Sequence, residues 1–439
     1  MGRTSRTAAR AAIVALLLAL PALVAWQAQS PAAPEAADTA LVGPDVVLVL
    51  TDDQSLEAVE RMPYVSSRTD WHTFSHAFVN NSLCCPARAT TLTGQYDTRT
   101  GVVHNLATGA FQDGQTLPVW LQQAGYRTGH FGKYLNGYPS VFGKGDTYVP
   151  PGWSEWRALF GGGLTQYDYT INENGAVRTY GSAPADYLVD VLRQQAVDFI
   201  RSTPADQPLF VYFTPTSTHE PWAAAPRHAG RFSGVRVPRY PNSNEADVSD
   251  KPTWVRRLPR LNMTTQDNQR RRAWRAALAV DDAVREIDAA LAATGRQDNT
   301  VLIFTSDNGY SFGAHRWPIK RCEFEECHHV PLLVRYPGTT GQADERLVGN
   351  VDLAPTIADL AGSSPSIPQG RPQPGPAPDG CRRGGMAHRT VAALGRRRQP
   401  GQERGSTGSR VVWHSDAQLP VRRARHRREG AVRPAIGPV

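Results

Sequence analysis

The chain has 439 residues, a formal net charge of +8 and five cysteines. This length exceeds what one hydrophobic core usually needs, but the composition is uneven along the chain. We therefore expect one large domain with additional terminal segments. Residues 363–439 hold 15 Arg and 4 acidic residues and contribute +11, which leaves −3 for the rest of the chain. The charge therefore excludes a uniformly basic body, and we expect no nucleic-acid partner.

The first 44 residues have the pattern of an export signal and a spacer. Three arginines precede an apolar run over residues 11–25, and an Ala/Pro-rich stretch follows. A membrane-spanning helix needs about 20 apolar residues, and Pro21 interrupts this shorter run. We expect a signal peptide over 1–28, a spacer over 29–44 and export to the periplasm, cell surface or medium, without stable membrane insertion after signal removal.

Short apolar runs alternate with helical patterns between residues 45 and 362. The runs are continuous, as is typical of strands that are buried on both faces of a parallel sheet. They predict strands over 46–50, 209–213, 301–305 and 331–336, and the helical patterns predict helices over 117–124, 185–202 and 273–294. The expected fold is α/β, with a mostly parallel, mixed central sheet covered by helices on both faces.

Acidic pairs follow two of the predicted strands. Asp52 and Asp53 come after the first strand, and Asp307 and Asn308 come after the strand over 301–305. Ligands of open α/β sheets bind outside the carboxyl ends of the strands, and four oxygen-bearing side chains suit Ca²⁺ or Mg²⁺. Alternatively, each acidic residue caps a turn, which is a common role of Asp and Asn. These residues alone leave both interpretations open.

Residues 82–94 read Ser-Leu-Cys-Cys-Pro-Ala-Arg-Ala-Thr-Thr-Leu-Thr-Gly. Proline is typical of the first turn of a helix, so Pro86 predicts that Cys84 lies at a helix N-terminus, where unpaired backbone N–H groups favour negative charge. Arg88 returns to the same side of the helix one turn later. An anion bound there contacts a nucleophile and a guanidinium together.

This segment resembles the sulfatase signature, C-x-P-x-R followed by x-x-x-L-T-G. The fixed positions are all matched, by Cys84, Pro86, Arg88, Leu92, Thr93 and Gly94. Further stretches resemble sulfatase blocks in the family's order, at 96–105, 124–129, 132–136, 218–221, 306–309, 313–332 and 351–356. The block at 132–136 is most similar to N-acetylglucosamine-6-sulfatases and related extracellular sulfatases. The resemblance implies an alkaline phosphatase-like sulfatase fold and hydrolysis of sulfate esters, on a sulfated sugar or an aryl sulfate.

The resemblance also implies roles for individual residues. A formylglycine-generating enzyme would convert Cys84 to formylglycine, whose hydrate is the nucleophile. The residues implied to bind Ca²⁺ are Asp52, Asp53, Asp307, Asn308 and the modified Cys84. The catalytic residues implied beside Cys84 are Arg88, Lys133, His219 and Lys320, with His219 as the first candidate for the general acid. His315 and Asn136 are candidates for substrate binding.

Three features depart from the family pattern. The spacing between His315 and Val330 is short by one residue, and no Gly precedes Lys320. Many sulfatases have a histidine two residues after the first lysine, where this chain has Leu135. The resemblance also ends near residue 370, where the family's small C-terminal sheet should begin. Residues 363–439 are rich in Arg, Gly and Pro, which predicts a tail that is disordered or encoded in a shifted frame, and a C-terminal sheet that is missing or disrupted.

Other interpretations remain open at this point. The same superfamily fold and modified cysteine serve phosphonate monoester and phosphodiester hydrolases. A basic secreted protein that binds polyanions through its arginine-rich tail is an alternative from another class. Cys322 and Cys327, separated by four residues, can form a small loop disulfide.

Overall fold

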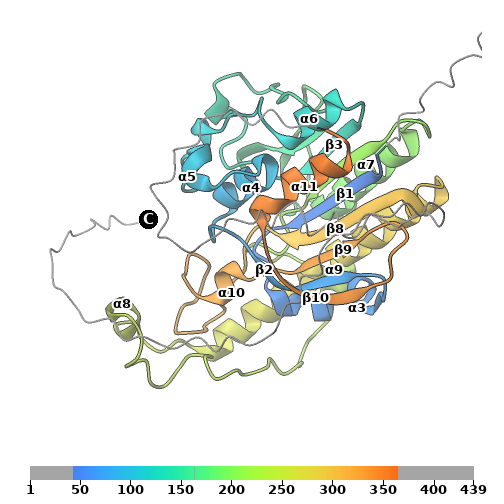
Figure 1. Ribbon diagram of the computed structural model, residues 1–439. Coiled ribbons are helices and arrows are strands. Elements are labelled where there is room, and N and C mark those ends of the chain that lie inside the picture. The colour runs from blue at the N-terminus through green and yellow to red at the C-terminus, as the bar shows by residue number, and fades with distance from the viewer. Residues whose placement is uncertain (1–42, 163, 364–439) are drawn as a thin grey trace, which may run out of the picture. The chain divides into compact units, whose positions relative to one another are not determined.

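The computed structural model describes residues 43–162 and 164–363 (Figure 1). The predicted signal peptide and nearly all of the predicted spacer and tail lie outside these residues, as does the predicted loss of the C-terminal sheet. Within the described part of the chain, no helix is both long enough and apolar enough to cross a membrane.

A ten-stranded mixed sheet forms the centre of the fold. Its strands, in spatial order, are β10 (Gln342–Gly349), β2 (His72–Phe78), β9 (Leu332–Arg335), β8 (Thr300–Ser306), β1 (Asp45–Thr51), β7 (Leu209–Thr214), β3 (Arg127–Gly132), β4 (Glu155–Leu159), β5 (Thr170–Glu173) and β6 (Ala176–Thr179). The central strands β8, β1, β7, β3 and β4 run parallel, whereas β9, β5 and β6 pair antiparallel with their neighbours. The predicted α/β fold with a mixed, mostly parallel sheet is confirmed.

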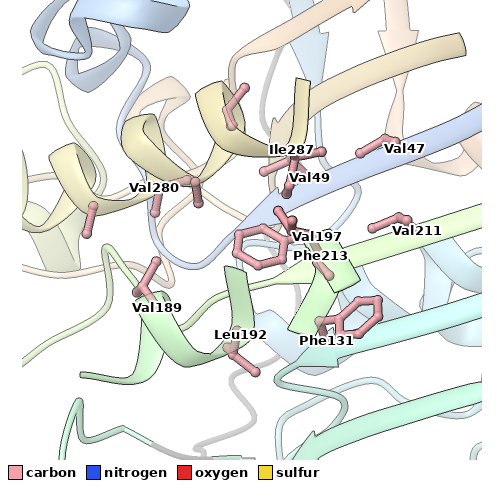
Figure 2. Close-up of a cluster of buried hydrophobic side chains, with 14 of the residues drawn as sticks. Val47, Val49, Phe131, Val189, Leu192, Val197, Val211, Phe213, Val280 and Ile287 are labelled. Atoms are coloured by element: carbon pink, nitrogen blue, oxygen red, sulfur yellow. The ribbon is translucent and has the colours of Figure 1, made fainter. Parts of the chain in front are cut away.

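Helices cover both faces of the sheet, and β1 shows how its sequence serves both. All seven of its residues are buried. Val47 and Val49 pack with α7 (Leu188–Ser202), α9 (Met263–Ala293) and α3 (Pro63–Ser67) on one face (Figure 2). Val46 and Leu48 pack on the other face with α4 (Cys84–Thr93), α6 (Leu117–Gln123) and α11 (Leu353–Leu360). Because each fully buried aliphatic side chain contributes about 1.5–3 kcal/mol, this double burial explains the continuous apolar run.

Helix α9 begins ten residues before the predicted start at residue 273. Its first turn is capped by Asn262, whose side chain accepts hydrogen bonds from the backbone N–H groups of Thr264 and Thr265. The residues added at this end are mostly polar, so the apolar periodicity that predicted the helix does not reach them. Helix α7 begins three residues later than predicted, because a 3₁₀ turn (Pro184–Asp186) precedes it.

The remaining helices are short. The α-helices are α5 (Asp97–Thr100), α8 (Thr253–Arg256) and α10 (Glu325–His328). The other 3₁₀ helices lie at Leu56–Arg61, Thr108–Ala110, Ser140–Phe142, Phe160–Gly162, Pro226–His228, Gln297–Asn299 and Asn350–Asp352.

Candidate active site

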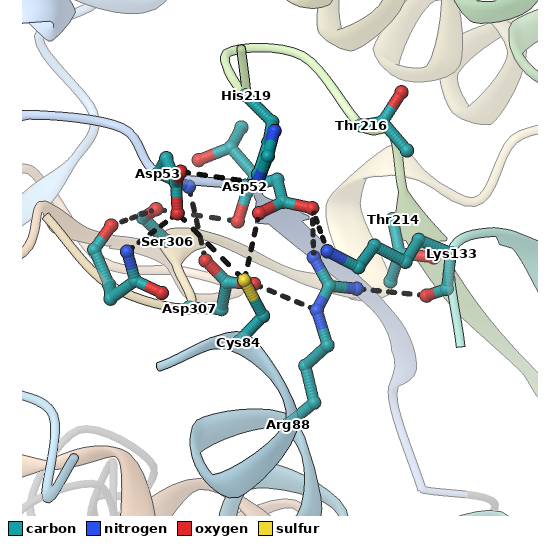
Figure 3. Close-up of polar contacts among 12 residues, drawn as sticks. Asp52, Asp53, Cys84, Arg88, Lys133, Thr214, Thr216, His219, Ser306 and Asp307 are labelled. Carbon is teal, nitrogen blue, oxygen red and sulfur yellow. Dashed lines mark hydrogen bonds and ion pairs between the residues drawn. The ribbon is translucent and has the colours of Figure 1, made fainter. Parts of the chain in front are cut away.

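The predicted site residues follow the carboxyl ends of four neighbouring parallel strands (Figure 3). Asp52 and Asp53 follow β1, Asp307 follows β8 and Lys133 follows β3. His219 lies five residues beyond the end of β7. Because these strands are parallel, all four ends lie at one edge of the sheet, where the N-terminus of α4 completes the site.

Helix α4 begins at Cys84, as the position of Pro86 predicts. All ten residues of the helix are buried, so the signature from Cys84 to Thr93 lies inside the fold, and Gly94 after it is half-buried. Gly94 ends the helix with φ of 65°, and its N–H donates to the carbonyl of Thr90 at 2.8 Å. A Cβ at Gly94 would lie 2.8 Å from Pro355, so the motif's glycine is required both by its left-handed backbone and by close packing.

The thiol of Cys84 lies among charged side chains. Lys320 Nζ donates to Cys84 Sγ at 2.8 Å, and Sγ lies 3.4 Å from Asp52 Oδ1. Cys84 is only 1% exposed. Burial and then the negative charge of Asp52 raise the pKa of this thiol well above its ordinary value, so the unmodified side chain is a neutral thiol at neutral pH.

Arg88 joins three parts of the site from a fully buried position. Its Nε donates to Asp307 Oδ2 at 2.8 Å, its Nη1 donates to the carbonyl of Lys133 at 2.8 Å, and its Nη2 lies 3.4 Å from Asp52 Oδ2. Burial lowers the pKa of Arg88, but the charges of Asp307 and Asp52 outweigh this effect and raise it. The guanidinium is therefore a fixed positive charge.

Two lysines that are far apart in the sequence each bind one of the two adjacent carboxylates after β1. Lys133 Nζ donates to Asp52 Oδ2 at 2.6 Å, and Lys320 Nζ donates to Asp53 Oδ1 at 2.8 Å. Burial opposes the charge on each lysine, but the neighbouring aspartate raises the pKa above its usual value. Gly132 permits this arrangement, because a Cβ there would lie 2.1 Å from the Thr214 carbonyl that accepts the Lys133 N–H.

His219 lies on the open side of the site. Its Nε2 is 3.5 Å from Asp53 Oδ2, and its Nδ1 lies 2.6 Å from the carbonyl oxygen of Glu220. The side chain is 16% exposed, whereas those of Arg88, Lys133 and the aspartates are almost completely buried. Of these groups, the imidazole is therefore the one that solvent and a bound molecule can contact.

The donor atoms fit a divalent cation. Asp52, Asp53, Cys84 and His219 each offer one ligand atom, and these atoms lie within 4.8 Å of one another. Asn308 Nδ2 donates to Asp53 Oδ1 at 2.7 Å, while its buried Oδ1 has no hydrogen-bond partner among the described residues. A buried amide oxygen without a donor, beside carboxylates, is a donor set that Ca²⁺ accepts.

The buried charges in this cluster balance. Asp52, Asp53 and Asp307 face Arg88, Lys133 and Lys320. Burial raises the pKa of Asp52, but the cations, led by Lys133, outweigh this effect and lower it well below its usual value. Burial and the charge of Asp52 raise the pKa of Asp307. Because charges buried without partners are costly, the three cations stabilise the acidic cluster in place.

The two predicted substrate-binding residues, His315 and Asn136, make other contacts. His315 Nδ1 lies 3.0 Å from Glu245 Oε1 and its Nε2 lies 3.7 Å from Glu326 Oε2. The backbone N–H of Asn136 donates to Cys85 Sγ at 3.3 Å. Within the described residues, neither side chain has a hydrogen bond or ion pair with the groups around Cys84.

Residues that sequence reasoning did not single out connect the two acidic turns. Ser306 Oγ accepts the backbone N–H of Gln54 at 3.0 Å and donates to the carbonyl of Asn308 at 2.8 Å. The only signal was their position beside acidic pairs at the ends of buried strands. The possible disulfide between Cys322 and Cys327 is present, and it closes a turn that begins two residues after Lys320.

A buried cysteine at a helix N-terminus, three carboxylates and three fixed cations lie together at the carboxyl edge of this sheet, which is the edge where open α/β sheets bind their ligands. Comparisons with known proteins assign the chain more closely. The family model named Sulfatase matches residues 44–363, and the chain belongs to the sulfatase family.

The chain is similar in sequence to one curated relative and in structure to two solved proteins. The human N-acetylglucosamine-6-sulfatase is 38% identical over an alignment of 340 residues that covers 73% of this chain and 61% of that protein. A structure described as a complex with its substrate D-glucosamine-2-N,6-O-disulfate has a TM-score of 0.61 at 24% identity, and the match covers 74% of this chain and 78% of that one. A phosphonate monoester hydrolase of Agrobacterium radiobacter has a TM-score of 0.58 at 20% identity, with 73% and 74% covered. Both structures share the fold.

Proposed function

We propose that this protein hydrolyses sulfate monoesters of a sugar, with Cys84 converted to formylglycine by a formylglycine-generating enzyme and with Ca²⁺ held by Asp52, Asp53, Asp307 and Asn308. The observation that carries the proposal is the convergence of two lysines on the nucleophile position. Lys320 Nζ lies 2.8 Å from Cys84 Sγ, and Lys133 Nζ binds the carboxylate beside it. Two ammonium groups beside one potential nucleophile suit an anionic ester.

The side chains have distinct tasks in this reaction. Lys133 and Lys320 bind the sulfate oxygens and offset the negative charge that repels an incoming nucleophile. Arg88 fixes the first of these lysines through its carbonyl and orients Asp307. His219 donates a proton to the departing alcohol oxygen, which an alkyl leaving group requires. The formylglycine hydrate would supply the attacking oxygen, and Ca²⁺ held by the aspartates and Asn308 would supply further positive charge at the sulfate.

The sugar part of the proposal rests on the relatives. The human relative that is 38% identical acts, by its name, on N-acetylglucosamine-6-sulfate. The likeness to a phosphonate monoester hydrolase is at 20% identity and concerns the fold. These comparisons favour a 6-sulfated glucosamine residue over a phosphorus ester. We further propose export of the protein, on the basis of the N-terminal sequence pattern.

A paired assay tests the proposal. Protein made in a host with the modifying enzyme is given N-acetylglucosamine-6-sulfate, an aryl sulfate and an aryl phosphonate monoester, each with Ca²⁺ or with excess chelator. We expect sulfate release in Ca²⁺, with a kcat/KM for the sulfated sugar well above that for the phosphonate, and no turnover by Lys320→Met. Faster hydrolysis of the phosphonate, or full activity after prolonged chelation, would contradict the proposal.

A further inference from the structure

Positive charge is concentrated in one internal segment of the described chain. Residues 227–275 hold 12 Arg and Lys against 4 Asp and Glu, a net charge of +8. The rest of residues 43–362 holds 18 Arg and Lys against 30 Asp and Glu, a net charge of −12. The modest overall charge of this part therefore conceals a strong asymmetry, which attracts polyanions to one region and repels them from the others.

Most cations of this segment are not used in ion pairs. Arg227, Arg239, Lys251 and Arg270 have acidic partners. Among the residues that the structure describes, the other eight arginines have no carboxylate within ion-pair distance: Arg231, Arg236, Arg256, Arg257, Arg260, Arg271, Arg272 and Arg275. Structural ion pairing therefore does not account for the excess charge.

Part of this basic segment is connected to the candidate active site through aromatic contacts. Trp254 in α8 is 38% exposed, and its ring lies 5.4 Å from the ring of Trp317 and 6.2 Å from that of Phe324. Trp317 Nε1 donates to the carbonyl of Lys320 at 2.8 Å, and Lys320 Nζ reaches Cys84 Sγ. A surface tryptophan is thus two contacts from the lysine beside the reactive atom.

Arg316 fastens α8 and its flanking residues to the loop that carries this lysine. Its Nε donates to the carbonyl of Glu245 at 2.9 Å, and its Nη1 donates to the carbonyl of Leu258 at 3.1 Å. The Cys322–Cys327 disulfide closes the turn that follows this loop. The exposed side chains on these two segments are therefore held at a fixed distance from the site.

We propose that Trp254, Arg256, Arg257 and Arg321 form a subsite for a second anionic sugar of a sulfated oligosaccharide. All four side chains are exposed, and Arg321 is the residue after Lys320. Guanidinium groups bind sulfate and carboxylate oxygens in a forked geometry, and the flat face of an indole packs against apolar surface while its edge stays hydrated.

The inference rests on the proposed function, because it names the chain-like substrate of the same site. In this proposal the sugar that carries the reactive sulfate lies at Cys84, and a further anionic sugar of the same chain binds over α8. A nucleic acid also carries regular negative charge, but the reactive site beside this surface makes a sulfated sugar chain the better fit.

Binding to the full chain carrying Cys84→Ala tests the subsite without turnover. The probe is a fluorescent, sulfated glucosamine-containing tetrasaccharide, and its Kd is measured by anisotropy at two salt concentrations. We expect the Arg256→Gln/Arg257→Gln pair to weaken binding about tenfold, from two partly exposed charge contacts, and to reduce its salt dependence. Trp254→Ala should weaken binding without changing the salt dependence. Arg201→Gln, an exposed arginine on α7, is the matched control and should leave the Kd unchanged.

Three outcomes decide the matter. An unchanged Kd in the double arginine variant overturns the subsite. So does a DNA oligonucleotide of equal charge that binds as tightly as the tetrasaccharide and is insensitive to Trp254→Ala, because that result describes a general polyanion surface. If wild-type protein releases no sulfate while the predicted losses of binding are observed, the subsite is supported and the proposed hydrolysis is the part that fails.

Discussion

Replacing Asp307 with asparagine keeps the shape of this side chain and removes its charge. Asp307 Oδ1 accepts the N–H of Asp53 at 3.1 Å, and Oδ2 accepts Arg88 Nε at 2.8 Å. An asparagine has one oxygen, so its NH₂ group must face one of these two donors. A lost hydrogen bond to a charged group costs about 1.5–3 kcal/mol. Asp52 still lies 3.4 Å from Arg88 Nη2 in the variant, so the guanidinium keeps one carboxylate partner. We therefore expect the free energy of unfolding to fall by an amount near this range, not by the larger cost of a buried charge without any partner.

Calcium adds a second effect that can be measured apart from activity. A perturbed metal shell typically loses about 10–100-fold in affinity, which lowers the stabilisation by added Ca²⁺ by about 1.4–2.7 kcal/mol. Thermal unfolding in chelator should show Asp307→Asn melting about 3–6 °C below wild type, at roughly 2 °C per kcal/mol for a domain of this size. Adding Ca²⁺ should widen that gap. Asp298→Asn, at an exposed position before β8, is the control. An identical Ca²⁺-induced shift in Asp307→Asn would refute the assignment.

Three further predictions concern the nucleophile, the lysine loop and acid stability. Mass spectrometry of the peptide containing Cys84 should detect an aldehyde that reacts with a carbonyl reagent; Cys84→Ala removes it and Cys85→Ala retains it, and a thiol in an active preparation would contradict this. His315→Ala should lower kcat about tenfold, because the loop of the second lysine loses two carboxylate contacts; partial rescue by His315→Gln is expected, and an unchanged kcat would exclude a positioning role. Burial raises the pKa of Asp288, but its hydrogen bonds, led by that from Arg335, lower it overall. Asp288 therefore stabilises the fold above the unfolded pKa of about 3.9, and this contribution is lost as pH falls through the lower folded value. In urea unfolding, the stability difference between wild type and Asp288→Asn should shrink from pH 6 to pH 3, and a constant difference would refute this.

The central strands could be predicted because they are buried on both faces. β1, β7 and β8 each contain a continuous apolar run. β3 is also almost entirely buried, but its sequence Arg-Thr-Gly-His-Phe-Gly contains no such run. All four residues of β6 are exposed, and only two of the eight residues of β10 are buried. Edge strands of this kind are held by backbone pairing, which leaves no hydrophobic pattern in the sequence.

Much of the candidate site could also be predicted, because its residues come with recognisable neighbours. Lys320 and Cys84 are 236 residues apart in sequence, yet their side chains meet. The surroundings of His315 were not predictable, because its partner Glu245 lies in a loop and its partner Glu326 in the four-residue helix α10, and neither segment has a periodic apolar pattern. The arginine-rich surface could not be predicted from the net charge. A net charge summed over the whole body cancels the excess in residues 227–275 against acidic residues elsewhere.

If Cys84 is converted to formylglycine as proposed, the complete burial of α4 makes this conversion compete with folding. Any enzyme that is to alter Cys84 needs the surrounding peptide as an extended chain, but all ten residues of this helix are enclosed once the sheet has assembled. A chain that folds before the enzyme acts would keep an unaltered thiol at Cys84. The enzyme could then reach this cysteine only if the domain unfolded again. The specific activity of a preparation then records the ratio of two rates, folding and alteration. Slower folding during synthesis should raise that activity without any change in the sequence.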